Sequence, residues 1–298
     1  MKEINTCLIC GSTKVEPFLV CKDYTVSQKE FQIQRCTDCN FKFTSPRPED
    51  ADLGKYYMAE DYVSHSDTKK GLVNKLYHGV RSYTLLKKLQ LVIQHTKLKS
   101  GKILDYGCGT GAFLNTCKTN KWDALGIEPD ETARKVMTEK FGISSFSSLA
   151  EAQKSNLFTG FDAITAWHVL EHVPDLKETI NSLRGALNDK GVFIVAVPNP
   201  ESHDAKHYKE FWAAYDLPRH LWHFEPKNMT KLFSDNGFKL EKTLPMIFDS
   251  FYVSMLSEKY KTGNTGLVKA FMRGLISNLK ANKTGKEFSS QIYVFRKV

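Results

Sequence analysis

Three glycines at alternating positions give the strongest chemical signal in this chain of 298 residues. Gly107, Gly109 and Gly111 follow the apolar stretch 103–106 and precede a stretch with helical spacing. Glycine lets the chain turn tightly at such a junction and brings bare backbone N–H groups against a ligand at the start of the helix. Glu128 ends the next apolar stretch, where its carboxylate can accept hydrogen bonds from both hydroxyls of a ribose. The spacing predicts a site for a nucleoside-containing ligand, and taken alone it fits a dinucleotide equally well.

Two Cys-x-x-Cys pairs near the N-terminus form the second signal. Cys7 and Cys10 make the first pair, Cys36 and Cys39 make the second, and 25 residues separate them. Four thiolates at this spacing suit a tetrahedral zinc ion, which is structural because no coordination position stays open. Cys21 lies between the pairs and is expected to be a small buried cysteine rather than a fifth ligand. The odd total of seven cysteines also fits a metal in a reducing compartment better than a disulfide framework.

Histidines and aromatic residues are dense after the apolar stretch 191–198. In an open α/β sheet, ligands bind beyond the carboxyl ends of the strands, so this connection is the expected acceptor site. We predict His220 as the general base, because an imidazole with an unperturbed pKa of about 6.5 is mostly neutral near neutral pH. His223 and Tyr215 are the alternatives for proton transfer, in which case His220 only hydrogen-bonds the loop to the sheet. The whole group comprises His203, His207, Tyr208, Trp212, Tyr215, Asp216, Arg219, His220, Trp222 and His223.

Alternating strand-like and helical stretches must position these residues. Strands that alternate with helices imply a mostly parallel sheet with helices on both faces, which is the doubly wound α/β class. An amphipathic helix over 72–95, with apolar residues at steps of three and four, precedes the sheet. The predicted strands are 102–106, 124–128, 161–167, 191–198, 238–244 and 291–296. The predicted helices are 113–120, 132–141, 176–187, 229–236, 249–260 and 265–281.

The segment 45–48, Ser-Pro-Arg-Pro, marks a domain boundary, because proline disfavours helix for the residue before it. We therefore divide the chain into a zinc-ribbon-like module at 1–48, a linker with the helical beginning of the catalytic domain at 49–100, and the rest of that domain at 101–298. A module of this size buries little apolar surface, so a bound metal ion would stabilise its fold.

Four motifs, taken in order, resemble the class I S-adenosylmethionine-dependent methyltransferases, and their small-molecule branch in particular. They are the glycine loop, Glu128, the stretch 161–164 with 167–172, and the stretch 187–191 before the next strand. The resemblance covers residues 100–245 and implies a Rossmann-like sheet of seven strands that binds S-adenosylmethionine. It places the methionine end near Trp167 and His168, the ribose at Glu128 and the adenine near Leu149. The implied cofactor-binding residues are Asp105, Tyr106, Gly107, Cys108, Gly109, Gly111, Phe113, Glu128, Pro129, Leu149, Trp167 and His168.

The two cysteine pairs and the stretch 41–48 resemble the zinc-binding lobe of the NDP-hexose C-methyltransferases. The stretch 215–224 is similar to their Glu-His-x-x-x-Phe motif, whose histidine serves as base, and the likeness puts His220 and Phe224 on that motif. Arg219 stands where those enzymes have the glutamate. The base then lacks a carboxylate partner, or Arg219 grips an anionic acceptor in bidentate fashion. The long C-terminal domain of those enzymes has no counterpart, so their substrate is not expected here.

The stretch 168–172 resembles a loop of the ubiquinone-type O-methyltransferases, in which acidic residues and a histidine can hold a divalent ion. His168 stands where one of those acids is expected, so we predict no such ion. Glu171 and His172 are then expected to begin the following helix and brace the loop. A metal site among the later histidines is also disfavoured, because no His-x-x-x-His pair with a carboxylate stands out.

The predicted activity is transfer of the sulfonium methyl group to an oxygen, nitrogen or carbon atom by direct displacement, with alignment of donor and acceptor supplying most of the rate. By resemblance, the acceptor is a small molecule of the nucleotide-sugar, glycan or lipid-like class. One alternative is a non-catalytic scaffold whose zinc ribbon docks a macromolecule. Another is a nicotinamide oxidoreductase, disfavoured because no Tyr-x-x-x-Lys pair follows the fourth strand.

The formal charge of +9 fits either a solvated surface, which we favour, or an anionic partner. No basic segment alternates with aromatic residues, so we expect no dedicated nucleic-acid binding. No stretch reaches the roughly 20 apolar residues that cross a bilayer, and we expect a cytoplasmic protein.

The stretch 265–281 carries an apolar stripe along one helical face, with cations elsewhere on the helix. Such a stripe could lie on an anionic membrane or cover the acceptor pocket. Packing on the domain core is the preferred interpretation, because it is the commoner fate of an amphipathic helix. The stripe consists of Leu267, Phe271, Leu275, Ile276 and Leu279.

Overall fold

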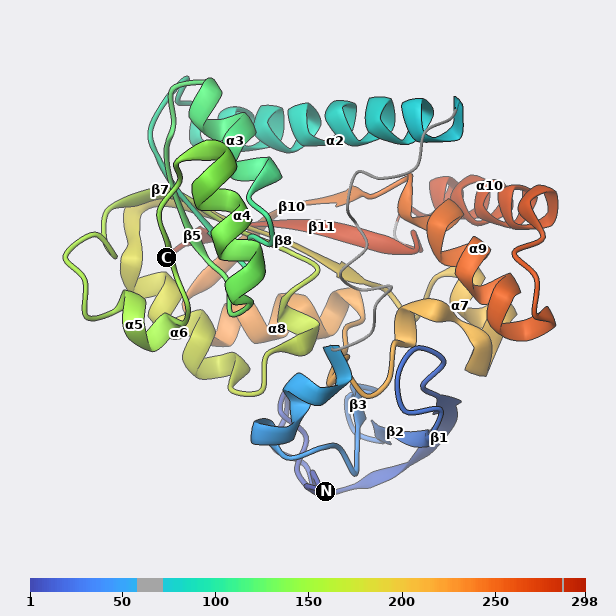
Figure 1. Cartoon of the computed structure of the whole chain (residues 1–298). Coiled ribbons are helices and arrows are strands. Elements are labelled where there is room, and N and C mark those ends of the chain that lie inside the picture. The colour runs from blue at the N-terminus through green and yellow to red at the C-terminus, as the bar shows by residue number, and fades with distance from the viewer. Residues whose placement is uncertain (58–71, 286) are drawn as a thin grey trace.

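A seven-stranded sheet lies at the centre of the molecule (Figure 1). In the computed structural model, which describes residues 1–57, 72–285 and 287–298, the strand order is β10-β11-β8-β7-β4-β5-β6. The strands are β4 (Lys102–Tyr106), β5 (Asp123–Ile127), β6 (Ser145–Phe146), β7 (Phe161–Trp167), β8 (Leu187–Pro198), β10 (Phe238–Pro245) and β11 (Ser290–Lys297). β11 pairs antiparallel with β8 and β10, whereas the pairs among β4 to β8 are parallel. The predicted mostly parallel sheet of seven strands is confirmed.

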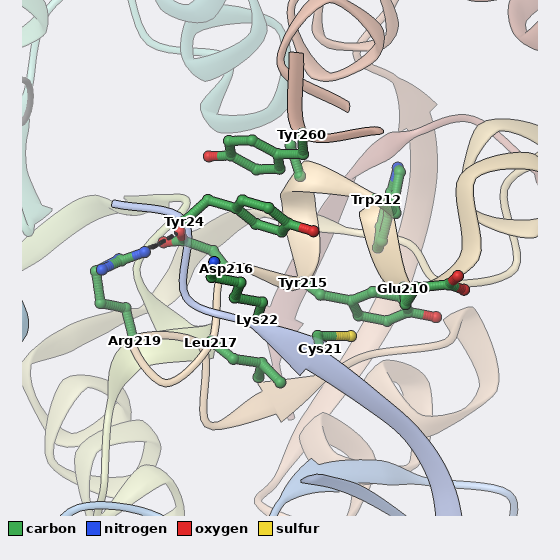
Figure 2. Close-up of a pocket in the computed structure, with 11 residues that line it drawn as sticks. Cys21, Lys22, Tyr24, Glu210, Trp212, Tyr215, Asp216, Leu217, Arg219 and Tyr260 are labelled. Carbon is green, nitrogen blue, oxygen red and sulfur yellow. Dashed lines mark hydrogen bonds and ion pairs between the residues drawn. The ribbon is translucent and has the colours of Figure 1, made fainter. Parts of the chain in front are cut away.

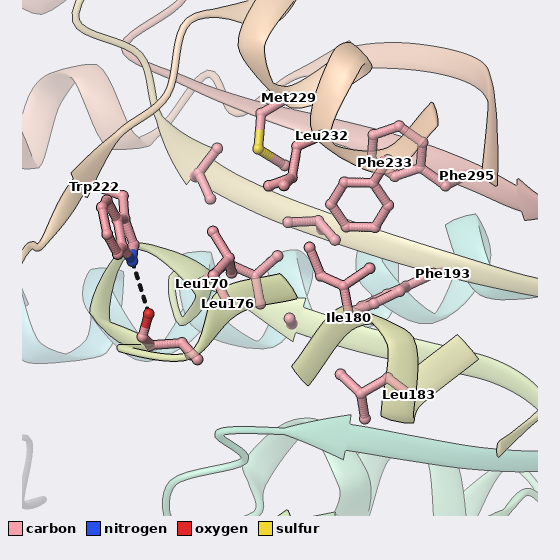
Figure 3. Close-up of a cluster of buried hydrophobic side chains, with 14 of the residues drawn as sticks. Leu170, Leu176, Ile180, Leu183, Phe193, Trp222, Met229, Leu232, Phe233 and Phe295 are labelled. Atoms are coloured by element: carbon pink, nitrogen blue, oxygen red, sulfur yellow. Dashed lines mark hydrogen bonds between the residues drawn. The ribbon is translucent and has the colours of Figure 1, made fainter. Parts of the chain in front are cut away.

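Helices cover both faces of this sheet. They are α2 (Leu72–Thr96), α3 (Ala112–Thr119), α4 (Glu131–Phe141), α5 (Leu149–Ala152), α6 (Leu176–Ala186) and α8 (Pro226–Asp235). The helices α7 (His203–Tyr208), α9 (Asp249–Thr262) and α10 (Leu267–Thr284) pack against one another. Because successive strand residues point to opposite faces, Ile103 packs in a cluster with α2, α3 and α4, while Leu104 packs with α5, α6 and α8. Figure 3 shows part of the second cluster, where Phe233 of α8 stacks on Phe295 of β11.

Most element boundaries follow the sequence prediction closely. β4 and β7 have the predicted bounds, and the predicted helix 265–281 is α10. β8 begins at Leu187 rather than at Gly191, because its first residues reach β7 through an irregular register that no periodicity reveals. α7 and β9 (Trp222–His223) are absent from the prediction, since such short elements carry no periodic signal.

The apolar stripe of α10 does not pack on the core, so the preferred interpretation of that stripe is wrong. Leu267, Phe271 and Leu279 are exposed. The helix instead turns small and polar residues inward, because α10 approaches α9 so closely that a Cβ on Gly274 would lie 2.8 Å from Phe251. None of the described helices has the length and the apolar composition needed to cross a bilayer.

The N-terminal residues form a second sheet of four strands. β1 (Val15–Lys22), β2 (Glu30–Cys36) and β3 (Lys42–Thr44) pair antiparallel in chain order. The fourth strand is β9, which pairs with β3 although it belongs to the connection after β8. The N-terminal module and the connection predicted to hold the acceptor site therefore share one sheet.

Buried polar contacts fasten this shared sheet. Lys42 forms an ion pair with Glu225, and both side chains are buried. Asn40 Nδ2 donates to Glu225 Oε1 at 2.6 Å, and Thr44 Oγ1 donates to the His220 carbonyl at 2.6 Å. On the other side of the connection, the Trp222 indole N–H donates to the Val173 carbonyl at 2.7 Å (Figure 3). Residues 40–44 of the N-terminal module thus help to position His220, the predicted base.

We predict that Lys42→Met lowers the free energy of unfolding by about 3 kcal/mol, because it removes the buried cation of Glu225 and leaves that carboxylate with only the exposed Lys227 at 3.3 Å. Chemical denaturation followed by circular dichroism measures this change. The matched control is Lys14→Met, since the Lys14–Asp38 pair is exposed and its loss should leave the unfolding midpoint in place. Equal effects of the two substitutions would contradict a specific role for the buried pair.

Candidate active site

The turn after β4 depends on its three glycines. Gly107, Gly109 and Gly111 have φ values of 75°, 53° and 75°, in the region that L side chains rarely adopt. A Cβ on Gly107 would come within 2.4 Å of Val169, and one on Gly111 within 2.4 Å of Met137. A Cβ on Gly109 would meet nothing within 4 Å. The loop therefore packs tightly at both ends and faces open space at its middle, where a ligand can approach the backbone.

Glu128 lies beside this open part of the loop. Its Oε2 accepts a hydrogen bond from the Gly109 N–H at 2.8 Å, and its Oε1 accepts one from the Asp130 N–H at 3.0 Å. The side chain is half-buried at the carboxyl end of β5. The structure thus brings the predicted ribose acid against the glycine loop.

Asp105 and Lys88 interact electrostatically near the loop. Asp105 is the residue before the end of β4, and it accepts a hydrogen bond from Thr165 Oγ1 at 2.5 Å. Burial raises the pKa of Asp105 to about 7, although the Thr165 hydrogen bond and the Lys88 charge oppose this shift. Lys88 comes from α2, its Nζ lies 4.3 Å from the centre of the Trp167 ring, and burial lowers its pKa. Lys88 is not recognisable from the sequence, because a single lysine in an amphipathic helix carries no motif.

His168 follows β7 with a positive φ of 57° and is held between two carboxylates. Its Nε2 lies 2.9 Å from Asp249 Oδ2, and its Nδ1 lies 3.4 Å from Glu171 Oε1. Burial opposes the charged imidazole, but Asp249 and Glu171 outweigh burial and raise the pKa of His168 to about 10. His168 is therefore an imidazolium near neutral pH and fixes the loop after β7. Asp249, at the start of α9, carries no sequence signal for this role.

The other predicted cofactor residues lie around the same edge of the sheet. The side chains of Cys108 and Phe113 pack in the core beneath α3, and the Phe113 ring contacts the Trp167 ring edge-on at 5.7 Å. Tyr106 and Leu149 pack against the cluster on the opposite face. Pro129 is exposed directly after Glu128. Residues from β4, β5, β7 and the start of α5 thus border one region.

His220 lies beside Glu171 and His172. The ring centres of His172 and His220 are 4.5 Å apart, and one nitrogen or carboxylate oxygen from each of the three side chains lies within 4.8 Å of the others. His220 Nδ1 donates to the Ala214 carbonyl at 2.8 Å, which leaves the Nε2 lone pair available. Nε2 lies 3.9 Å from Asp216 Oδ2. Burial, reinforced by His172, lowers the pKa of His220 well below its ordinary value, so the imidazole is neutral.

Glu171 is the buried carboxylate of this group. It is 1% exposed, and neither oxygen has a hydrogen-bond partner among the described residues. It lies in η2 (Leu170–His172), whose backbone also anchors the connection: the Leu221 N–H donates to the Glu171 carbonyl at 2.7 Å. From the sequence, Glu171 and His172 are expected only to brace the loop, because their proximity to His220 depends on a contact between residues 48 positions apart in the chain.

His223 and Tyr215 lie away from this group, in the packing against the N-terminal module. His223 Nε2 is 3.3 Å from Thr44 Oγ1, and burial lowers the pKa of His223 to about 3. The Tyr215 ring packs edge-on against His223 and Trp212, and burial raises the pKa of its hydroxyl. The charge of Glu171 also acts on His223, but of the three candidate bases only His220 belongs to the described group whose nitrogen and carboxylate oxygen atoms lie within 4.8 Å of one another.

Arg219 faces the module as well (Figure 2). Its Nε donates to Asp216 Oδ2 at 2.9 Å, and its Nη1 donates to the Tyr56 carbonyl at 3.0 Å. Both Nη atoms lie 3.4 Å from Asp23 Oδ1. The guanidinium is buried and committed to these groups, which disfavours the interpretation that it grips an anionic acceptor. Arg219 and Cys21 both line the pocket drawn in Figure 2, and Cys21 lies apart from the four other N-terminal cysteines.

The four remaining cysteines of the module converge. Their sulfur atoms all lie within 4.8 Å of one another, with Cys7 and Cys39 3.5 Å apart and Cys10 and Cys36 3.6 Å apart. Four thiolates bound about 2.3 Å from one zinc ion would be separated by roughly 3.8 Å. The donor set and its spacing fit such an ion.

Comparison with known proteins identifies similar sequences and folds. A family model described as a methyltransferase domain matches residues 77–243. An uncharacterized protein of Methanocaldococcus jannaschii is 28% identical over 172 residues, covering 57% of this chain and 72% of that protein. A ubiquinone biosynthesis O-methyltransferase of Methylococcus capsulatus is 33% identical over 97 residues, which cover 30% of this chain and 39% of that enzyme.

Two solved structures have a similar fold. Magnesium protoporphyrin IX methyltransferase from Synechocystis with bound SAH has a TM-score of 0.54 at 14% identity, covering 84% of this chain and 100% of that one. Geranyl diphosphate C-methyltransferase from Streptomyces coelicolor has a TM-score of 0.52 at 15% identity, covering 84% and 90%. At these identities the likeness concerns the fold.

We predict that Glu128→Ala weakens S-adenosylmethionine binding by about 1.5 to 3 kcal/mol, because it removes charge-assisted hydrogen bonds to ribose. Isothermal titration calorimetry measures the affinity. Asp123→Ala is the matched control, since Asp123 is an exposed acid at the opposite end of β5. Unchanged affinity in the Glu128 variant would place the ribose elsewhere.

Proposed function

The chain belongs to the methyltransferase-domain family, and from that premise we propose that it methylates a small-molecule acceptor with His220 as the general base. Because its family model is a methyltransferase domain, the chain is an S-adenosylmethionine-dependent methyltransferase. The match disfavours the two alternatives, a scaffold protein and a nicotinamide oxidoreductase. The observation that carries the proposal is the neutral, buried imidazole of His220 beside the carboxylate of Glu171.

The residues at the carboxyl edge of the sheet suit the cofactor. The open backbone at Gly109 and the carboxylate of Glu128 would hold the nucleoside, and Trp167 would border the methionine end. Lys88 would add a cation for the carboxylate at the methionine end of the cofactor, since the Lys88 amine lies over the Trp167 ring. When bound, the cofactor supplies an electrophilic methyl group on a positively charged sulfur.

His220 is oriented for proton removal. Its Nδ1–H is fixed on the Ala214 carbonyl, so Nε2 is the atom that takes the proton as the acceptor gains its methyl group. The imidazolium that results is stabilised by the carboxylates of Glu171 and Asp216. The NDP-hexose C-methyltransferases have a glutamate at the position that resembles Arg219. Glu171 and Asp216 would supply the carboxylate partner that Arg219 cannot provide.

A lipid-like acceptor has more support than the nucleotide-sugar and glycan classes. Several relatives carry the name ubiquinone biosynthesis O-methyltransferase, although the chain spans only 39% of the first of them. Arg219, the strongest candidate to bind an anionic group, is instead occupied by Asp216 and Asp23.

A structural zinc ion bound by Cys7, Cys10, Cys36 and Cys39 completes the proposal. Such an ion would stabilise the two Cys-x-x-Cys turns of the module 1–48. Strand β3 of this module pairs with β9 of the domain at 101–298, and residues 49–100 connect the module to that domain. The zinc would take no part in the methyl transfer, because four thiolates leave no open position.

Purified protein should therefore contain one zinc ion per chain by mass spectrometric metal analysis. Cys36→Ser should lower both the zinc content and the melting temperature, because three thiolates bind the ion more weakly. Cys21→Ala serves as the control, since Cys21 lies outside the cluster and should leave the zinc content intact. A wild-type protein without bound zinc would contradict the proposed zinc site.

His220→Ala should reduce the rate of methyl transfer by about 100-fold or more while the affinity for S-adenosylmethionine stays constant, because a base acts on the acceptor. Transfer of labelled methyl groups to a metabolite extract measures the rate. His95→Ala is the control, as His95 lies on α2, pairs with Glu241 of β10 and belongs to no part of the candidate site.

Other outcomes reassign the chemistry. Survival of activity in His220→Ala with loss in His223→Ala would move the base to His223. Normal rates in both variants would mean that the acceptor supplies its own nucleophile. Activity that disappears on chelation and returns with magnesium would assign Glu171, His172 and His220 to a bound cation instead.

A further inference from the structure

The exposed face of α10 is apolar, which is unusual for a helix that packs on a folded domain. Five large apolar side chains on it are between 49% and 81% exposed. With each residue advancing about 100° around the helix, they fall within a sector of roughly 140°. They are Leu267, Val268, Phe271, Met272 and Leu279.

The inward face of α10 cannot take these side chains. It buries Ala270, Ser277 and Ala281, and Gly274 sits against the backbone of Phe251 in α9. Small residues there let the two helices approach closely, so the large apolar residues must point outward. The outward stripe is therefore a consequence of the packing between α9 and α10 and not of a loosely attached helix.

The apolar surface continues beyond α10. The Phe271 ring stacks on Phe251 at 5.0 Å, and Phe251 lies one turn along α9 from Phe248. Phe248 in turn contacts Tyr83 of α2 edge-on at 6.2 Å. Phe248 and Tyr83 are each about half exposed. Aromatic contacts thus join α2, α9 and α10 along one side of the molecule (Figure 1).

Cations border this surface. α10 contains no acidic residue, and Arg273, Lys280 and Lys283 lie on the helix sector next to the apolar stripe. α10 packs against α7, and burial together with the charges of Lys280 and Arg273 lowers the pKa of His203 on that helix. The nearest described acid on α9, Glu258, is buried and already paired with Lys269.

From this arrangement we propose that α10, with the adjoining parts of α9 and α2, docks on an anionic lipid surface. Apolar side chains would enter the boundary between headgroups and acyl chains, while the bordering lysines and arginine would contact anionic headgroups. The proposal does not depend on the identity of the base or of the acceptor.

Sedimentation of the full-length protein with vesicles tests this docking. At low salt the protein should bind vesicles of phosphatidylcholine mixed with phosphatidylglycerol, and high salt or phosphatidylcholine alone should weaken binding. The double variant Leu267→Ser, Phe271→Ser should bind about tenfold or more weakly. Arg273→Gln and Lys280→Gln should each weaken binding about fivefold.

Leu157→Ser is the matched control, because Leu157 is a half-exposed leucine in the segment between α5 and β7. It should bind vesicles as the wild type does, and melting curves should show that all variants fold. Absence of binding to anionic vesicles, or an equal loss in the Leu157 variant, would overturn the proposal. So would a wild-type dimer that the double variant converts to a monomer, since a second copy would then cover the stripe.

Discussion

The connection between β8 and α8 is restrained from two sides, and the candidate active site depends on that restraint. On one side β9 pairs with β3, and Lys42 neutralises the buried Glu225. On the other side the Leu221 N–H and the Trp222 indole donate to carbonyls that follow β7. A long connection held in this way keeps His220 in place without help from a ligand. If His220 is the base, as proposed, the entropy of positioning it is lost when the protein folds and not when an acceptor binds.

Arg219 shows how the same connection accommodates charge beneath the surface. Burial alone would raise the pKa of Asp216, but Arg219 outweighs burial and lowers it. The guanidinium also reaches Asp23 and the Tyr56 carbonyl, so one side chain joins the connection to two separate parts of the N-terminal region. An arginine can serve this purpose because its planar group donates in several directions at once. Arg219 thus anchors the loop, while Asp216 and Glu171 keep carboxylates near His220.

The sequence predicts the parts of the site that lie within single strand-turn-helix units. The glycine loop and Glu128 are recognisable because their functions follow from local backbone geometry and a fixed spacing along the chain. Lys88 and Asp249 are not recognisable, since Lys88 reaches the site from α2, before the sheet, and Asp249 from α9, between β10 and β11. Each is a single polar residue on a helix that carries no motif. The strand β9 is missed for a related reason: two residues show no alternation, and their partner strand lies in another part of the chain.

The charges at the carboxyl edge of the sheet also constrain the reaction. Glu171 is buried without a hydrogen-bond partner among the described residues, and its nearest cation is His168 at 3.4 Å. A buried carboxylate in this state favours any additional positive charge nearby. In the proposed reaction the positive charge leaves the methyl donor and reappears on His220 as it takes the acceptor's proton. The new imidazolium would lie beside Glu171 and 3.9 Å from Asp216, and both carboxylates would stabilise it. Glu171 has no hydrogen-bond partner among the described residues, so it can interact with that charge, which is the physical reason for placing the base at His220.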